Sequence, residues 1–156
     1  QWPAPNIDHS GTKVMHQEVF PRGLGNFSAP EYAEPNEQAS EDYPFILVTG
    51  RNLFHYNAGT QTRRTDLLQF RPTDILDMHP EDANGMGIAD GQDVYLSSPR
   101  NKVKMKVNLT NDVRIGNLFT TFHFPEVAVN SVISASADDY TKCPEYKVQA
   151  VAIQPC

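Results

Sequence analysis

The chain has 156 residues, of which 39% are hydrophobic, and a formal net charge of −6. This length accommodates one domain with a substantial core, and the acidic balance excludes a general basic face for duplex nucleic acid or an anionic membrane. Every apolar run is shorter than the roughly 18 residues that a membrane-spanning helix needs, so we expect no membrane insertion. An anionic ligand must therefore be bound by a local group of cations.

The two cysteines and five histidines do not form a metal motif. Cys143 and Cys156 lack CxxC spacing, and the histidines show no HExxH pattern. We therefore predict no metal site built by this chain. Two cysteines in a domain of this size indicate unpaired thiols in a reducing, cytoplasmic compartment. The chain begins with Gln1 instead of Met, so we interpret it as processed or as a piece of a longer protein.

Residues 1–42 are predicted to form an extended arm. They carry five of the twelve prolines and little apolar periodicity, which argues against an independent domain. Aromatic side chains such as Trp2 and Phe20 are spaced as anchors for a surface. The acidic stretch 34–42 is interpreted as a solvated linker. We therefore expect an arm at 1–42 and a folded domain at 43–156.

The stretch from Tyr43 to Thr65 combines a strand with many polar side chains. Residues 45–48 are an apolar, β-branched run that predicts a buried strand, and Gly50 ends it. Arginine binds phosphate bidentately, hydroxyls and amides complete the hydrogen bonding, and Gly50 and Gly59 let backbone amides approach a ligand. An anion and nucleotide site is therefore predicted just past this strand. Its polar members are Arg51, His55, Asn57, Thr60, Gln61, Thr62, Arg63 and Arg64.

Short elements follow in chain order. Residues 79–87 predict a helix, because Pro80 suits the first helical position and Gly87 suits a left-handed stop. Asp82 is assigned a structural role at the helix N-terminus. The other expected elements are a helical turn at 66–70, strands at 74–78, 92–98, 102–109, 116–121 and 148–153, and an irregular or partly helical region at 127–140.

The strand expected at 102–109 alternates between two faces. One face is apolar and predicts core, whereas the other carries lysines. We interpret the lysine row as a solvated edge, with a phosphate-binding ridge as the alternative. The apolar face is Val103, Met105, Val107 and Leu109, and the polar face is Lys102, Lys104, Lys106 and Asn108.

About six short strands joined by short helices and turns predict a mainly β barrel and not a doubly wound sheet. Gly85, Gly87 and Gly91 superficially match a dinucleotide fingerprint. They lie at the end of a predicted helix, however, and not between a strand and a helix start. A Rossmann fold is therefore disfavoured.

Short motifs occur in a fixed order along almost the whole chain. They are Gln1-Trp2-Pro3, His9-Ser10-Gly11-Thr12, Phe20-Pro21-Arg22-Gly23, Gly25-Asn26-Phe27, Thr49-Gly50-Arg51, His55-Tyr56, Thr62-Arg63-Arg64, Pro80-Glu81-Asp82-Ala83, Phe122-His123-Phe124, Asn130 and Pro144-Glu145-Tyr146-Lys147. Each motif alone is weak. Their order and spacing resemble the molybdopterin oxidoreductases, the DMSO reductase family, and within it the C-terminal domain of formate dehydrogenase catalytic (alpha) subunits.

The resemblance implies a double-psi β-barrel that binds bis(molybdopterin guanine dinucleotide) with molybdenum or tungsten. A twice-charged pyrophosphate buried between domains needs cations and amides around it, so the assignment is physically coherent. The resemblance implies no catalytic and no metal-ligating residue in this chain. The implied cofactor-binding residues are Arg51, His55, Asn57, Thr60, Thr62, Arg63, Phe122, His123, Asn130, Tyr146 and Lys147.

Ordinary structural roles for these residues stay open at the level of the sequence. Arg63 and its neighbouring arginine form the kind of pair that is usually a surface charge, and a lone histidine such as His55 is more often structural. Asn130 also suits a turn cap, Lys147 a solvated strand start and Tyr146 a core position.

The resemblance further implies a parent enzyme that oxidises formate to carbon dioxide, or runs the reverse. Iron–sulfur clusters and electron-transfer subunits would lie elsewhere in that enzyme, so the isolated chain is expected to be inactive and to pack on the rest of the catalytic subunit. A sibling enzyme such as assimilatory nitrate reductase is the first alternative, and a free-standing binding barrel the second. A small hydrolase or decarboxylase is disfavoured, because no nucleophile, base and orienting group can be assembled around Ser97, Ser98 and His123.

Overall fold

The computed structural model describes residues 4–16, 20 and 22–156. Contacts divide the chain into two compact units, Gln1–Glu34 and Pro35–Cys156. Within its described residues the first unit has no helix or strand, and residues 35–42 belong to the second unit. The motif Gln1-Trp2-Pro3 and Pro21 lie outside the described residues. None of the helices in the described ranges is long and apolar enough to cross a membrane.

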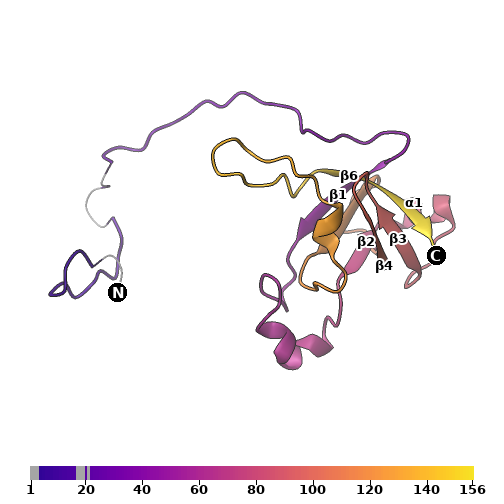
Figure 1. Cartoon of the computed structure of the whole chain (residues 1–156), viewed down its shortest axis with the longest axis horizontal. Coiled ribbons are helices and arrows are strands. Elements are labelled where there is room, and N and C mark those ends of the chain that lie inside the picture. The colour runs from indigo at the N-terminus through magenta and orange to yellow at the C-terminus, as the bar shows by residue number, and fades with distance from the viewer. Residues whose placement is uncertain (1–3, 17–19, 21) are drawn as a thin grey trace. The chain divides into compact units, whose positions relative to one another are not determined.

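The second unit is a closed barrel of six strands in the order β1-β5-β2-β4-β3-β6. Figure 1 labels five of these strands. Neighbours β1 and β5 run parallel, as do β2 and β4, and the other pairs are antiparallel. The predicted mainly β barrel is therefore confirmed. The strands are β1 Phe45–Gly50, β2 Ile75–Met78, β3 Asp93–Ser97, β4 Lys102–Leu109, β5 Asn117–Thr121 and β6 Gln149–Pro155.

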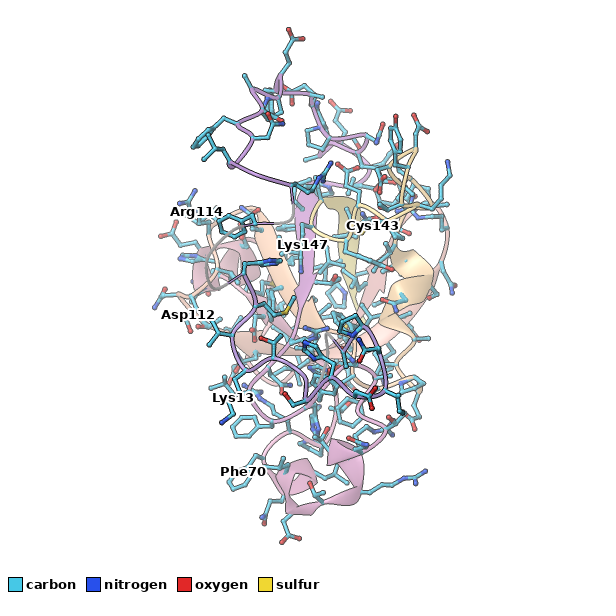
Figure 2. All side chains as sticks on the ribbon, turned by 90° about the vertical axis from the view of Figure 1, so that its left-hand side faces the viewer. Lys13, Phe70, Asp112, Arg114, Cys143 and Lys147 are labelled. Atoms are coloured by element: carbon cyan, nitrogen blue, oxygen red, sulfur yellow. The ribbon has the colours of Figure 1, made fainter. Side chains whose placement is uncertain are left out.

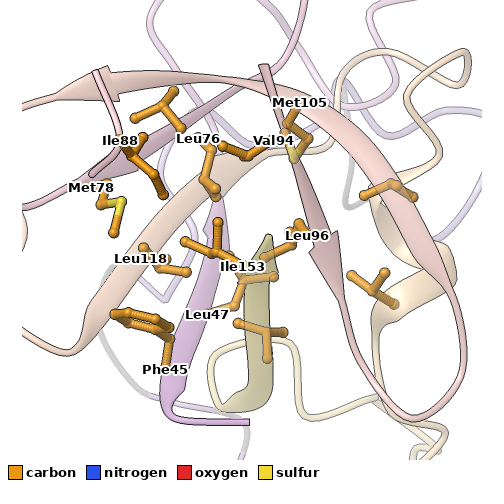
Figure 3. Packing of buried hydrophobic residues seen from close by; sticks show 14 of the residues in the cluster. Phe45, Leu47, Leu76, Met78, Ile88, Val94, Leu96, Met105, Leu118 and Ile153 are labelled. Carbon is orange, nitrogen blue, oxygen red and sulfur yellow. The ribbon is translucent and has the colours of Figure 1, made fainter. Parts of the chain in front are cut away.

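The barrel interior is filled by alternate residues of every strand (Figure 3). Leu47, Leu118 and Leu76 are fully buried on three adjacent strands, and Leu96 and Val151 are buried across from them. Each side chain of this kind contributes about 1.5–3 kcal/mol when it is removed from water. The alternation predicted for β4 is confirmed at the buried positions 103, 105 and 107.

Short helical elements connect the strands. Three of them, η2, α1 and η3, lie within regions predicted as helical or partly helical, whereas η1 was not predicted. The helix α1, Pro80–Met86, begins after His79, whose side chain accepts a hydrogen bond from the Glu81 amide, and it ends at Gly87 with φ 67°. The Asp82 carboxylate accepts a bond from the Gly116 amide at 2.8 Å, so its structural role is confirmed and α1 is tied to the segment entering β5. The 3-10 helices are η1 Thr62–Arg64, η2 Asp66–Gln69 and η3 Val129–Val132.

The lysine row is solvated, but it does not lie on a sheet edge as expected. Barrel closure places β4 between β2 and β3. Lys104 and Lys106 pair with Asp93, at 2.9 and 3.1 Å, and the ammonium of Lys102 lies 4.3 Å from the ring centroid of Tyr95. Hydrogen bonds from the two lysines lower the pKa of the Asp93 carboxyl. The row is therefore engaged with β3 and is not a free phosphate-binding ridge.

The acidic stretch before β1 is also not a simple solvated linker. Glu37 forms an ion pair with Arg100, and the exposed fractions of the two side chains are only 17% and 28%. Its partner lies 63 residues away, so sequence-local reasoning could not find it. This contact fixes part of residues 35–42 to the barrel.

Candidate functional site

Three irregular segments meet at one end of the barrel because of the strand directions. Since β1 and β5 are parallel neighbours, with Thr49 beside Thr120, the loops that leave them emerge at the same end. Strand β6 runs antiparallel to β1, so the turn that enters β6 lies there too. The Thr49 hydroxyl donates to the Tyr146 carbonyl at 3.0 Å. We call this end the rim, which comprises residues 51–64, 122–126 and 146–147.

His123 holds the first rim loop in place. The Asn52 amide donates to its Nε2 at 3.2 Å, so Nε2 is the acceptor. Its Nδ1 lies 2.5 Å from the Asn57 carbonyl oxygen, so Nδ1–H is the donor. These two bonds define a neutral Nδ1–H tautomer. The ring is fully buried, and it bridges both sides of the turn that follows β1.

Asp74 anchors the second rim loop. One carboxylate oxygen accepts from the Thr121 hydroxyl and from the His123 amide, the latter at 3.1 Å, and the other oxygen accepts from the Phe124 amide at 2.9 Å. The residue is only 1% exposed. Asp74 therefore fixes the backbone that carries His123, and through that histidine it fixes the first loop.

His55 is a structural partner within the first loop. Its Nε2 lies 2.7 Å from the carbonyl oxygen of Arg71, so Nε2–H donates. The Thr62 hydroxyl, 3.1 Å from Nδ1, accepts from the Tyr56 amide and keeps its own proton for the imidazole. Both ring nitrogens are thus satisfied inside the chain, and His55 is only 4% exposed. Direct contacts from His55, Thr62 and His123 to a cofactor stay predictions.

The exposed rim groups are cations and polar side chains. Arg51 Nη2 lies 2.5 Å from Asn57 Oδ1, and its guanidinium is 5.9 Å from the centre of the Tyr56 ring. Asn57 has φ 47°, a left-handed backbone that asparagine tolerates better than most residues. Lys147 Nζ donates to the Thr49 carbonyl. Thr60 and Tyr146 are also exposed.

Arg63 lies between the two rim loops. Its Nη2 donates to Glu126 at 2.6 Å, and its guanidinium carbon lies 4.5 Å from the centre of the Phe124 ring. The hydrogen bond from Arg63 lowers the pKa of the Glu126 carboxyl. Arg63 Nε is buried without a hydrogen-bond partner among the described residues. A buried donor without a hydrogen-bond partner is rare in folded proteins.

Phe122 and Asn130 complete the predicted set. The Phe122 ring lies 5.5 Å from the His123 ring, so it belongs to the rim. Asn130 is exposed on η3, a separate element that Arg100 holds by donating to the Val132 carbonyl at 2.9 Å. The structure therefore brings ten of the predicted residues together on the rim and places Asn130 on η3. Figure 2 labels one of the ten, Lys147.

Sequence reasoning missed Asn52 of the rim and Asp74, which holds the second rim loop from the entrance of β2. Asp74 was assigned only to a strand, and Asn52 was not singled out. Asn52 Oδ1 accepts from the amides of Phe54 and His55, at 2.8 and 2.9 Å, in a local turn that asparagine favours. The available signals were an asparagine immediately after Gly50-Arg51 and an acidic residue at the entrance of a buried strand.

The donor set of the rim fits a phosphate-bearing ligand. Guanidinium and ammonium groups supply charge, and amide and hydroxyl groups supply additional donors. The orphaned Nε of Arg63 adds a buried donor. The chain as a whole has a net charge of −6, so this cationic end contrasts with the rest of the protein.

Comparison with known proteins identifies the family. Residues 45–150 match the family described as "Molydopterin dinucleotide binding domain". This match covers more than half of the chain and contains all the rim segments. The chain therefore belongs to the molybdopterin dinucleotide-binding domains, and its barrel is of the double-psi type.

The most informative relatives are formate dehydrogenase subunits. The chain is 39% identical over 156 residues to F420-dependent formate dehydrogenase 1 subunit alpha of Methanococcus maripaludis, covering 98% of this chain and 23% of that protein. It is 38% identical to the corresponding subunit alpha of Methanocaldococcus jannaschii, with 98% and 23% covered. The chain thus spans about a quarter of the length of these relatives, and it is homologous to formate dehydrogenase alpha subunits, which confirms the predicted resemblance.

A sibling enzyme and a solved structure also match. The assimilatory nitrate reductase catalytic subunit of Bacillus subtilis is 32% identical over 160 residues, covering 99% of this chain and 22% of that protein. Acetylene hydratase from Pelobacter acetylenicus aligns with a TM-score of 0.68 at 17% identity, covering 81% of this chain and 21% of that protein. At this identity the structural likeness supports the fold alone.

Proposed function

We propose that this chain closes over the bis(molybdopterin guanine dinucleotide) of a molybdenum or tungsten formate dehydrogenase as the C-terminal part of its catalytic subunit. The parent enzyme oxidises formate to carbon dioxide or runs the reverse. The metal centre, when bound, supplies the two-electron redox chemistry. Iron–sulfur clusters and electron-transfer subunits belong to the rest of the enzyme, and the free thiols of Cys143 and Cys156 suit a cytoplasmic location.

The observation that carries the proposal is the convergence of three cationic or polar segments on one end of the barrel. Thr49 contacts Tyr146 and Lys147 directly, and His123 contacts Asn52 and Asn57. Residues 51–64, 122–126 and 146–147 therefore form one continuous surface, although about 80 positions separate the first segment from the last in the sequence. A dinucleotide pyrophosphate needs such a surface.

Each group of rim residues has a distinct role in this proposal. Arg51 and Lys147 supply charge to the pyrophosphate, while Asn57, Thr60, Asn130 and Tyr146 donate to the remaining polar atoms. Arg63 offers its unpaired Nε, and Phe122 supplies an apolar wall. His55, Thr62 and His123 orient the first loop and reach the cofactor only where their geometry changes on binding.

A pair of arginine variants tests the site in the parent catalytic subunit. The Arg51→Ala variant lacks a charge-assisted hydrogen bond that contributes about 1.5–3 kcal/mol. When cofactor is limiting, the amount of bound molybdopterin per polypeptide, measured after denaturing the purified enzyme, should therefore fall. Arg114→Ala is the matched control, because Arg114 precedes β5 and lies at the opposite end of β1. Equal cofactor content in both variants would contradict the proposed rim site.

A second assay separates formate dehydrogenase from its sibling. The identity to formate dehydrogenase subunits alpha is 38 to 39%, against 32% for the assimilatory nitrate reductase subunit. We therefore expect formate-dependent dye reduction by the parent enzyme after growth with molybdate or tungstate, and no nitrate-dependent dye oxidation. Nitrate turnover without formate turnover would assign the chain to the sibling. The 156-residue chain alone should show neither activity, which distinguishes it from an autonomous enzyme.

A further inference from the structure

Residues 35–42, which we call the strap, are held to the barrel at Asn36 and Glu37. The Glu37 carboxylate accepts hydrogen bonds from both terminal nitrogens of Arg100. Nη1 donates to Oε1, and Nη2 donates to Oε2 at 3.1 Å. The same Oε2 accepts from the Ala150 amide at 3.0 Å. One carboxylate therefore joins the strap to the β3–β4 turn and to the start of β6.

The Arg100 contact extends from the strap to η3. Arg100 donates from Nε and Nη2 to the Val132 carbonyl, at 3.2 and 2.9 Å. Asn101 beside it donates to the Ser131 hydroxyl at 2.9 Å. Since Asn130 precedes these two residues on η3, the Glu37–Arg100 pair fixes the element that carries this predicted cofactor contact.

Asn36 makes the corresponding contact to the segment before β6. Its amide nitrogen Nδ2 donates to the Ser136 hydroxyl at 2.6 Å, and its backbone amide donates to Glu145 Oε2 at 3.2 Å. The Glu145 amide in turn donates to the Ser136 carbonyl at 3.0 Å. The strap therefore fixes the position from which Tyr146 and Lys147 enter the rim.

Apart from Ala150 at the start of β6, these anchors lie in the β3–β4 turn, in η3 and in the segment before β6, whereas the barrel itself is closed by its six strands without the strap. The exposed fractions of Glu37 and Arg100, 17% and 28%, place their charges partly out of water, where a bidentate pair holds a defined geometry. Loss of one partner should consequently loosen η3 and the residues before β6 more than the sheet.

We propose that Asn36 and Glu37 are positioning residues of the dinucleotide site, which set the placement of Asn130 and of Tyr146–Lys147. This inference rests on the proposed function of the rim. It assigns a role to the strap, which none of the predicted cofactor contacts includes. The strap residues themselves do not touch the ligand in this proposal.

The test compares three variants of the 156-residue chain. Glu37→Gln and Asn36→Ala remove strap contacts, and Glu41→Gln is the control, because Glu41 is an exposed strap residue and undergoes the same change of charge. Backbone hydrogen exchange reports on placement without any ligand. We expect the Ser131 amide to exchange about tenfold faster in Glu37→Gln, and the Glu145 amide about tenfold faster in Asn36→Ala. In both variants the exchange rates of amides in β1 and β5 should stay within about twofold of the unsubstituted chain.

GDP is the probe for binding, with Arg51→Ala as the reference variant. We expect Glu37→Gln to weaken GDP binding about fivefold, since ordering the loosened segments opposes association, and Glu41→Gln to leave it unchanged. Unchanged exchange in both strap variants overturns the inference. So does faster exchange with unaltered GDP affinity while Arg51→Ala weakens binding. If Arg51→Ala also leaves GDP affinity unaltered, the proposed rim site itself fails. Should Glu37→Gln not fold, Asn36→Ala decides the outcome alone.

Discussion

At the scale of single residues, the rim separates side chains that build the loops from side chains that face outward. His55 and His123 use both ring nitrogens inside the chain. Arg51 and Lys147 are exposed and each makes a hydrogen bond with a near neighbour. A buried imidazole whose two nitrogens are hydrogen-bonded makes the loop rigid. An exposed guanidinium is hydrated, and a ligand can replace that water with its own acceptors.

Among the polar residues that hold the rim loops, Asp74 should be the most sensitive to substitution. In Asp74→Asn an amide NH₂ replaces an oxygen that accepts from a buried backbone or hydroxyl donor. We expect the free energy of unfolding to fall by about 2 kcal/mol, measured by urea denaturation at pH 7. Asp139→Asn is the control, because the Asp139 side chain is fully exposed, and it should change stability by less than about 0.5 kcal/mol. Equal effects would show that Asp74 is not an anchor.

Two glycines predict opposite effects of the same substitution. At Gly59, φ is 66° and an added Cβ would lie 2.5 Å from the Arg63 side chain and 3.1 Å from the His123 carbonyl. Gly59→Ala should destabilise the chain by about 1–3 kcal/mol. Gly85 lies in α1 with nothing within 4 Å of such a Cβ, so Gly85→Ala should stabilise by about 0.5–1 kcal/mol. Thermal unfolding of both variants measures the difference, and the same sign for both would refute this geometry.

At the scale of elements, the loop before β6 is organised around one carboxylate. Asp138 accepts from the amides of Tyr140, Thr141 and Cys143 and from the Thr141 hydroxyl. A single bridge between Ala137 and Pro144 closes the loop. The hydrogen bonds that Asp138 accepts lower the pKa of its carboxyl from 3.8 to about 2. The two from Thr141 have the largest effect, and the one from Cys143 has a smaller effect.

The pH dependence of this loop follows from that shift. Because the folded pKa lies below the unfolded one, the stabilisation is complete above 3.8 and is lost as pH falls towards about 2. Amide chemical shifts of Thr141 and Cys143 should therefore titrate with a midpoint near 2, and Asp138→Asn should abolish that titration. A midpoint at the ordinary value of a free aspartate would mean that the carboxylate does not hold the loop.

The strands and α1 were predictable because their signals are local. Alternating burial in β4, Pro80 at the start of α1 and Gly87 at its end are all visible in a few consecutive residues. The strap contact and the role of Asp74 were not predictable, since their partners are 47 to 113 residues away. Barrel closure was not predictable for the same reason, because the strand that lies beside β4 is set by pairing between distant residues. The prediction that the lysine row lies on a sheet edge was therefore wrong.

The candidate site was predictable in part for a related reason. Residues 51–63 are concentrated in one loop, so composition alone indicated an anion site there. That Tyr146–Lys147 and Phe122 lie on the same rim follows only from the parallel pairing of β1 with β5 and the antiparallel pairing of β1 with β6. These residues were predicted from the family motifs, and the strand pairing accounts for their position on the rim.

At the scale of the whole molecule, the candidate site is the rim at one end of the barrel, and the chain lines it from one side only. The chain spans only 23% of the length of the formate dehydrogenase relatives. Leu53 and Tyr56 on the first rim loop, and Phe70 directly after η2, are exposed by 58% or more. Large apolar side chains so exposed are typical of surfaces that bind another protein surface. Binding of a nucleotide by this chain alone should therefore be weak, with a Kd of about 1 mM.

An NMR titration of the ¹⁵N-labelled 156-residue chain with GDP tests the rim most directly. We predict shift changes concentrated at residues 51–63, 122–124, 130 and 146–147, which weaken in Arg51→Ala. Shifts concentrated instead at the opposite end of the barrel, around Asp112 and Arg114 beside the 430 Å³ cavity on the outer face of β1 and β5, would contradict the account. So would the absence of any shift at GDP concentrations well above about 1 mM.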